Sequence, residues 1–131
     1  MQAYITAIVA ATVASYVLGS LWYLWLGKSW RAAVGWNKQG SAYRPSPFEL
    51  IVGLIGQLVM AIALSVLFTA IGAVGVLPAV TAAAAIWLGF ILPTLATNVI
   101  FQRRSTTLIW QDGLHWLLIL ASQAVVLALL S

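Results

Sequence analysis

The sequence predicts an all-α integral membrane protein, built as one antiparallel bundle of four transmembrane helices over residues 1–131. Three observations lead to this fold. Hydrophobic residues make up 63% of the chain and charged residues 6%, against about 25% charged residues in soluble domains. The mean hydropathy is +1.05. Four apolar stretches, at about 3–26, 47–71, 78–101 and 108–130, each reach the roughly 20 residues that a helix needs to cross a bilayer.

The first span, from Ala3 to Leu26, lacks the basic start and the small-residue cleavage site of a signal peptide. We therefore expect it to stay in the mature protein. A connection over 27–46 follows this span. Within it, the segment from Trp30 to Tyr43 is expected to form a short interfacial helix and then an irregular stretch.

The second span begins with a recognisable helix start. Ser46 can cap the helix, Pro47 suits the first helical position, and Glu49 completes a capping box. Glycine and proline residues over 72–78 mark a short turn into the third span, and the hydroxyl side chains at 105–106 suit the start of the fourth. Connections this short make neighbouring helices antiparallel.

The positive charges give the predicted orientation. All six cationic side chains fall in the connections over 27–46 and 102–107, while residues 72–77 carry no charge. By the positive-inside rule both basic loops are cytoplasmic, and both termini then lie outside. Topology and anionic lipid head groups explain these cations better than nucleic acid does, so no nucleic-acid partner is expected. The cations are Lys28, Arg31, Lys38, Arg44, Arg103 and Arg104.

Tryptophan follows the same pattern. Six of the seven tryptophans lie near the cytoplasmic ends of their segments, which predicts an interfacial aromatic belt. The alternative interpretation is that Trp22 and Tyr23 line a ligand site. The belt residues are Trp22, Trp25, Trp30, Trp36, Trp110 and Trp116.

Small and polar residues recur every four positions along the first three spans. Because hydrophobicity does not drive helices together in lipid, such stripes form the contacts between helices. We expect them to pack within the bundle, with a dimer face as the alternative. The stripes are Ala7, Ala11, Ser15 and Gly19; Gly53, Gln57, Ala61, Ser65 and Thr69; and Thr81, Ala85, Gly89, Pro93 and Thr97.

A polar layer is expected near the middle of the membrane. At about 1.5 Å per residue, Gln57 lies about 15 Å from the cytoplasmic end of its span, and Trp87 and Gln123 lie about 14 and 12 Å from the outer ends of theirs. At least two of the three should bond to each other or to backbone carbonyls. These side chains either fix the register of the helices or line a translocation path or a ligand cavity. Gly89 and Pro93 form a candidate hinge, because the proline ring crowds the carbonyl of Gly89.

A second polar layer lies near the cytoplasmic face, where Asn98, Arg103 and Arg104 end the third span and Asp112 and His115 open the fourth. Asp112 and His115 share a helix face because they are three residues apart. One interpretation is an ion pair from Asp112 to either arginine, with His115 bonded to Asn98 or to a backbone carbonyl. The other is proton transfer or ligand binding by Asp112 and His115.

Motifs for catalysis and metal binding are nearly absent. The sequence has no glycine-rich phosphate loop, no paired carboxylates in one site, no cysteine, and a single histidine. We therefore expect no metal site and no cofactor, and the sequence favours a protein without enzymatic activity. A membrane enzyme or a haem protein with His115 as axial ligand is the least favoured alternative.

Five separated motifs carry a resemblance to a known family. They are Gly19-Ser20-Leu21-Trp22-Tyr23, Gly27-Lys28-Ser29-Trp30, Trp87-Leu88-Gly89-Phe90 with Pro93, Phe101-Gln102-Arg103-Arg104, and Asp112-Gly113-Leu114-His115. Over nearly the whole chain the sequence resembles the bacterial membrane family of domain of unknown function 1761. The resemblance implies a small four-helix protein of the bacterial inner membrane. The resemblance implies no activity, because none is established for the family. It favours one shared structural or functional centre, formed by Trp22, Tyr23, Arg103, Asp112 and His115.

The leading functional hypothesis is a small multi-pass membrane protein without enzymatic activity. It would act as a homo-oligomer or as an accessory subunit of a larger membrane complex, packed through its small-residue stripes. The alternative is a small-molecule or proton-coupled transporter, or a ligand-binding membrane protein, with its site at Asp112 and His115.

Overall fold

The computed structural model describes residues 2–35 and 45–131, and all regular structure within these residues is helical. Four of the helical stretches are long and apolar enough to cross a membrane: Tyr4–Trp25, Pro47–Ile71, Val76–Phe101 and Thr107–Leu130. The elements are α1 (Gln2–Trp25), α2 (Gly27–Ala33), α3 (Pro47–Ile71), α4 (Val76–Ile86), the π-helical segment η1 (Trp87–Ile91), α5 (Leu92–Phe101) and α6 (Thr107–Leu130).

The four predicted apolar helices are therefore confirmed, with ends within a few residues of those expected. The first connection differs in one detail. Its short helix, α2, begins at Gly27 and not at Trp30. The irregular stretch expected up to Tyr43, and Trp36 with it, lies largely outside the described residues.

Helix ends follow the predicted capping chemistry. At the start of α3 the Ser46 hydroxyl accepts from the Glu49 backbone N–H at 3.2 Å, and the Glu49 carboxylate accepts from the Ser46 N–H at 3.3 Å. Gly72 ends α3 with a φ of 68°, a left-handed conformation that glycine adopts without strain. At the start of α6 it is Ser105 whose hydroxyl accepts from the Thr107 N–H, at 3.3 Å.

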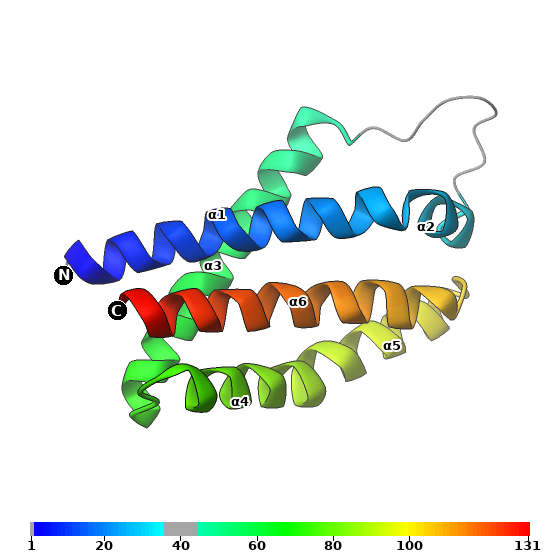
Figure 1. Cartoon of the computed structure of the whole chain (residues 1–131). Helices are drawn as coiled ribbons and strands as arrows, with labels where there is room; N and C mark the ends of the chain where they lie inside the picture. Colours follow the sequence, from blue (N-terminus) through cyan, green and yellow to red (C-terminus); the bar gives the residue numbers. More distant parts are fainter. Residues whose placement is uncertain (1, 36–44) are drawn as a thin grey trace.

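The third span bends where proline predicts it. Figure 1 shows α5 turning away from the direction of α4, and η1 lies between them. Pro93 has no N–H to donate and its ring crowds the carbonyl four residues earlier, so the wider π turn just before it relieves the crowding. The role of Gly89 and Pro93 as a hinge stays a prediction.

The pair α1 and α6 forms the centre of the fold. Figure 1 shows these two helices side by side, with both chain ends at one end of the molecule and α2 and the α5–α6 turn at the other. Helix α3 crosses behind them, and α4 packs against α6. Small side chains dominate the core and let the backbones approach closely. The buried cluster comprises Ala7, Ala11, Ala61, Leu64, Phe68, Ala79, Ala83, Leu120, Ala124 and Leu127.

The small-residue stripes do not all have the expected role. The α1 stripe is buried along its whole length, whereas every member of the stripe from Thr81 to Thr97 is exposed. For that stripe, the expectation of packing within the fold is wrong. The buried face of α4 carries Ala79 and Ala83, two positions before Thr81 and Ala85. Two residues turn a helix by about 200°, so the stripe faces away from α6.

Candidate functional site

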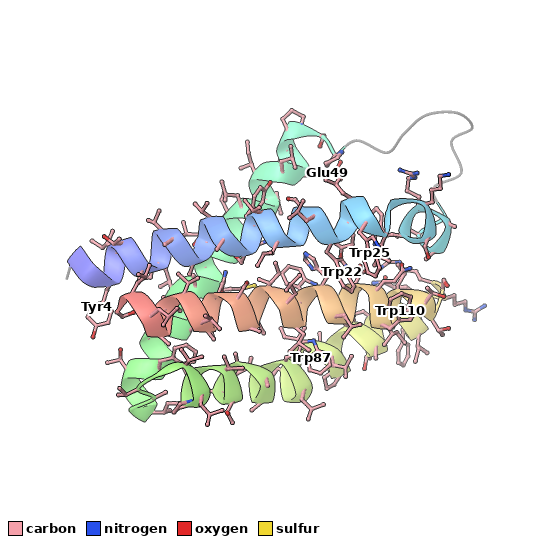
Figure 2. All side chains as sticks on the ribbon, viewed as in Figure 1. Tyr4, Trp22, Trp25, Glu49, Trp87 and Trp110 are labelled. Carbon is pink, nitrogen blue, oxygen red and sulfur yellow. The ribbon has the colours of Figure 1, made fainter. Side chains whose placement is uncertain are left out.

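Polar side chains gather where the end of α1, the short α2 and the start of α6 meet. Figure 2 shows Trp22 and Trp25 at this end of α1, beside the beginning of α6 that carries Trp110. We call this group the end cluster. It comprises Trp22, Tyr23, Ser29, Trp30, Gln111, Asp112 and His115.

Asp112 joins three helices through one carboxylate oxygen. The Tyr23 hydroxyl on α1 donates to Oδ1 at 2.6 Å, and the Trp30 indole on α2 donates to the same atom at 3.0 Å. Hydrogen bonds to an ionised acceptor are shorter and stronger than neutral ones. The half-buried carboxylate therefore fixes α2 against the helical pair.

The ion pair expected between Asp112 and Arg103 or Arg104 is not found among the described residues. Among the described residues its hydrogen bonds come from Tyr23 and Trp30 and not from Arg103 or Arg104. Both arginines are exposed, and the Arg104 guanidinium donates to the Gln102 side chain at 3.4 Å. Asp112 lies more than one turn inside α6 and faces α1 and α2, so the side chains of the turn before α6 do not meet it.

His115 lies one turn deeper and is buried, with 5% of its surface exposed. Its ring packs 4.5 Å from the Tyr23 ring and 4.7 Å from the Trp116 ring. Within the described part of the chain Nδ1 has no hydrogen-bond partner, so the predicted bond to Asn98 or to a backbone carbonyl is not made by this atom. Asn98 is exposed on α5.

Gln111 completes the end cluster from the face of α6 that carries His115. Its backbone carbonyl accepts from the Trp22 indole at 3.0 Å, and its side-chain amide donates to the Ser29 hydroxyl at 2.7 Å. The side chain is fully buried, and among the described residues its Oε1 has no partner. Sequence reasoning missed Gln111 and Ser29. The four-residue spacing from Gln111 to His115 was the signal that could have found the glutamine.

Four of the six tryptophans expected in an interfacial belt divide into two groups. Trp25 and Trp110 are exposed, at 75% and 47%. Trp22 and Trp30 instead donate hydrogen bonds to α6. The second pair therefore contributes to the contacts between helices.

A second polar cluster lies further along α1 and α6, where α3 packs against them. It comprises Ser15, Gln57 and Gln123, and we call it the amide cluster. The Gln123 amide donates to the Gln57 backbone carbonyl at 2.9 Å and to the Ser15 hydroxyl at 3.0 Å. The Ser15 hydroxyl is 2.7 Å from the Gln57 side-chain oxygen, to which it donates. The prediction that at least two of Gln57, Trp87 and Gln123 bond to each other or to backbone carbonyls is confirmed, since Gln123 and Trp87 both donate to backbone carbonyls. Ser15 is an additional member of the cluster.

Trp87 does not belong to the amide cluster. Figure 2 shows it between α6 and the junction of α4 with α5, and its indole donates to the Gly113 carbonyl at 2.7 Å. Gly113 is ten residues from Gln123, or about 15 Å along α6. The single layer of Gln57, Trp87 and Gln123 was therefore a wrong expectation, because Trp87 lies level with the end cluster.

The donors of the end cluster are used in its own hydrogen bonds, whereas some acceptor capacity is left. Asp112 accepts through Oδ1, and Gln111 Oε1 is an acceptor without a partner among the described residues. A neutral imidazole can accept a proton at one nitrogen and release one from the other. The arrangement is therefore suited to protons, to water and to solutes that donate hydrogen bonds.

The comparison with protein families identifies a family for this chain. The model of the family described as Protein of unknown function (DUF1761) matches residues 6–128. This confirms the family resemblance seen in the sequence. No curated protein and no solved structure matches the chain.

Proposed function

The chain belongs to the family described as Protein of unknown function (DUF1761), and because that description names no activity, we propose a function from the geometry of the chain itself. We propose an integral membrane protein that moves protons, alone or with a small polar solute, through the end cluster. The observation that carries this proposal is His115, a buried imidazole whose Nδ1 has no partner among the described residues, on the same helix as a carboxylate held by Tyr23 and Trp30.

The proposed placement is an antiparallel four-helix bundle in the bacterial inner membrane. Large apolar side chains are exposed along α3, among them Ile55 at 54% and Val66 at 65%, and such a surface needs lipid or protein around it. Lys28 and Arg31 on α2 lie at the same end as the arginines of the α5–α6 turn. The positive-inside rule puts this end in the cytoplasm, both termini outside, and the exposed tryptophans at the interface.

The contacts of Asp112 and His115 favour a functional site over a packing role. A packing role predicts Asp112 paired with an arginine and His115 bonded to a backbone carbonyl, as a buried charge and a buried imidazole normally require. The observed partners of Asp112 are neutral donors, and His115 Nδ1 has none among the described residues. Ionisable residues with incomplete pairing inside apolar helices typically mark proton or ligand pathways.

Proton uptake by proteoliposomes tests the proposal. The protein is reconstituted around a pH-sensitive dye, potassium and valinomycin clamp the voltage, and the outside is acidified. The wild-type protein should acidify the lumen faster than empty liposomes do, and Asp112→Asn or His115→Phe should return the rate to that of empty liposomes. Glu49→Gln is the matched control, because Glu49 is the only other acid and caps a helix. Equal rates for wild type, Asp112→Asn and His115→Phe would overturn the proposal.

Assembly with a second copy is the other candidate function, as a homo-oligomeric or accessory subunit. The exposed stripe from Thr81 to Thr97 favours it, because small residues on a membrane helix allow another helix to approach closely. The chain has no cysteine, so single cysteines report contacts cleanly. Ala85→Cys should form disulfide-linked dimers in native membranes, and Ala83→Cys, whose parent residue is fully buried, should not. Equal cross-linking at both positions would argue against this face as an interface.

A further inference from the structure

One face of α6 joins the end cluster to the amide cluster. Gln111, His115, Ile119 and Gln123 follow each other at four-residue spacing, and each is at most 5% exposed. Opposite them on α1 lie Trp22, Gly19 and Ser15, which meet Gln111, His115 and Gln123 in turn. The two clusters are therefore the ends of one continuous seam between α1 and α6.

The polar members of this face share a feature found nowhere else in the described residues. Every buried side-chain nitrogen or oxygen without a partner lies on this face: Gln111 Oε1, His115 Nδ1 and Gln123 Oε1. Buried polar atoms almost always have a partner, which is ordered water where protein does not supply one. We therefore expect water molecules at both ends of the seam.

Ile119 separates these two polar stretches. It is fully buried and is the apolar member of the face between His115 and Gln123. A Cβ atom added at Gly19 would lie 2.8 Å from Ile119 Cδ1 and 2.8 Å from His115 Nε2. The side chains of Ile119 and His115 therefore pack directly against the backbone of α1 at Gly19. No space is left for a further side-chain atom at this level of the seam.

We propose that the seam is a proton path from the end cluster to the amide cluster, carried by buried water, with Ile119 as its hydrophobic gate. This deepens the proposed function and rests on it. His115 Nδ1 takes up a proton that comes from water beside Asp112, and Nε2 releases one toward the amide cluster. The imidazole starts and ends neutral, so only its tautomer changes. A constriction lined by one apolar side chain stops the path while it is dry and opens it when water enters.

The amide cluster also points to where the path continues. Along α3, Gln57 is followed after two turns by Ser65, about 12 Å away along the helix. Ser65 and Thr69 line a cavity of about 290 Å³ at the end of the molecule that holds both termini, together with Tyr4 and Ser131. Protons would enter or leave the path through this cavity at the end of the molecule that holds both termini.

The proteoliposome assay tests the gate directly through Ile119→Ser. A polar, smaller side chain should let water past the constriction and raise proton uptake about tenfold, which corresponds to roughly 1.4 kcal/mol of barrier. Ile62→Ser is the matched control, because the same change on the exposed face of α3 leaves the seam intact. Adding Asp112→Asn to Ile119→Ser should abolish the increase, which distinguishes flow through the seam from a general leak.

A second measurement needs no substitution at the gate. Water-edited solid-state NMR of the wild-type protein in lipid, with nitrogen-15 labelled glutamine and histidine, should show water next to the Gln123 amide and the His115 imidazole. If Asp112→Asn and His115→Phe lower uptake but Ile119→Ser behaves like Ile62→Ser, the gate is refuted and the proposed function stands. Absence of water at both side chains also refutes the path. If neither wild type nor Ile119→Ser exceeds empty liposomes, both proposals fall.

Discussion

Among the described glycines, Gly19 is the position where an added methyl group should have the largest effect on stability. An alanine Cβ there would lie 2.8 Å from His115 Nε2 and 2.8 Å from Ile119 Cδ1, whereas non-bonded atoms pack best at about 3.5–4.0 Å. Both contacts would be too short by about 0.7–1.2 Å. His115 is 5% exposed and Ile119 is fully buried, so neither can swing out to solvent. In Gly19→Ala either these two buried side chains must repack or α1 must move away from α6.

The size of the effect follows from two opposing terms. Overpacking a well-filled core costs about 1–3 kcal/mol, and two simultaneous short contacts place Gly19→Ala at about 2–3 kcal/mol. Alanine gains back about 1 kcal/mol over glycine in a helix. The net expectation is a loss of about 1–2 kcal/mol. Gly56→Ala on α3 is the matched control, since nothing lies within 4 Å of its Cβ, and it should gain up to about 1 kcal/mol.

Unfolding in mixed detergent micelles, with increasing dodecyl sulfate and tryptophan fluorescence as the signal, measures both variants against wild type. They should differ from each other by about 2–3 kcal/mol in free energy of unfolding. Ile119→Val removes the Cδ1 atom, so the double variant Gly19→Ala with Ile119→Val should recover part of the loss. A Gly19→Ala protein as stable as Gly56→Ala would refute the close approach of α1 and α6 at this level.

Three further predictions concern two other contacts and the orientation in the membrane. Tyr23→Phe removes the 2.6 Å bond to Asp112 and should lower the free energy of unfolding by about 1.5–3 kcal/mol, the range for bonds to charged groups. Tyr16→Phe removes a 2.9 Å bond to the Leu50 carbonyl and should lose only about 0.5–1.5 kcal/mol; the reverse order would show that Asp112 does not hold the helices together. Gln123→Leu leaves the Ser15 hydroxyl and the Gln57 carbonyl without their donor and should destabilise by about 1–3 kcal/mol in the same assay. The exposed Gln102→Leu should change little, and similar effects at both positions would contradict the amide cluster. For orientation, a membrane-impermeant maleimide should label Lys28→Cys only from the cytoplasmic side and Val74→Cys, at a residue 83% exposed, only from the outside. Labelling of both from one side would overturn the proposed topology.

The helices could be predicted closely because their signals are local. Ser46, Pro47 and Glu49 lie next to each other in sequence, and the capping box that they form depends on no other part of the chain. The bend before Pro93 is equally local, since a proline crowds its own helix wherever that helix packs. The wrong expectation for the stripe at Ala85 has a different origin. Periodicity shows that a helix has a small-residue face, but the packing partner decides which face is buried, and α4 packs through Ala83.

The candidate site was predictable only in part for the same reason. The spacing of Asp112 and His115 places both on one side of a helix, and this needs only helical geometry. Their partners Tyr23 and Trp30 are more than 80 residues away in sequence, so they follow from how α1 and α2 pack on α6. Nearness in sequence favoured Arg103 and Arg104 instead. The same reasoning put Trp87 in the wrong layer, because equal depths were counted along helices whose relative heights were not known.

The seam between α1 and α6 combines two features that packing alone does not explain. Ala7, Ala11 and Gly19 bring the two backbones together, and Leu127 and Ile119 fill the space on α6 as an apolar core requires. If packing were the only requirement, the polar side chains of that face would be expected to have every buried polar atom paired within the protein. Each unpartnered buried atom there carries a penalty of about 1–3 kcal/mol unless water pairs it. Three of them together would reach roughly 3–9 kcal/mol, comparable with the whole stability of a typical domain, about 5–15 kcal/mol. Buried water removes this penalty, and the same water would carry protons along the seam.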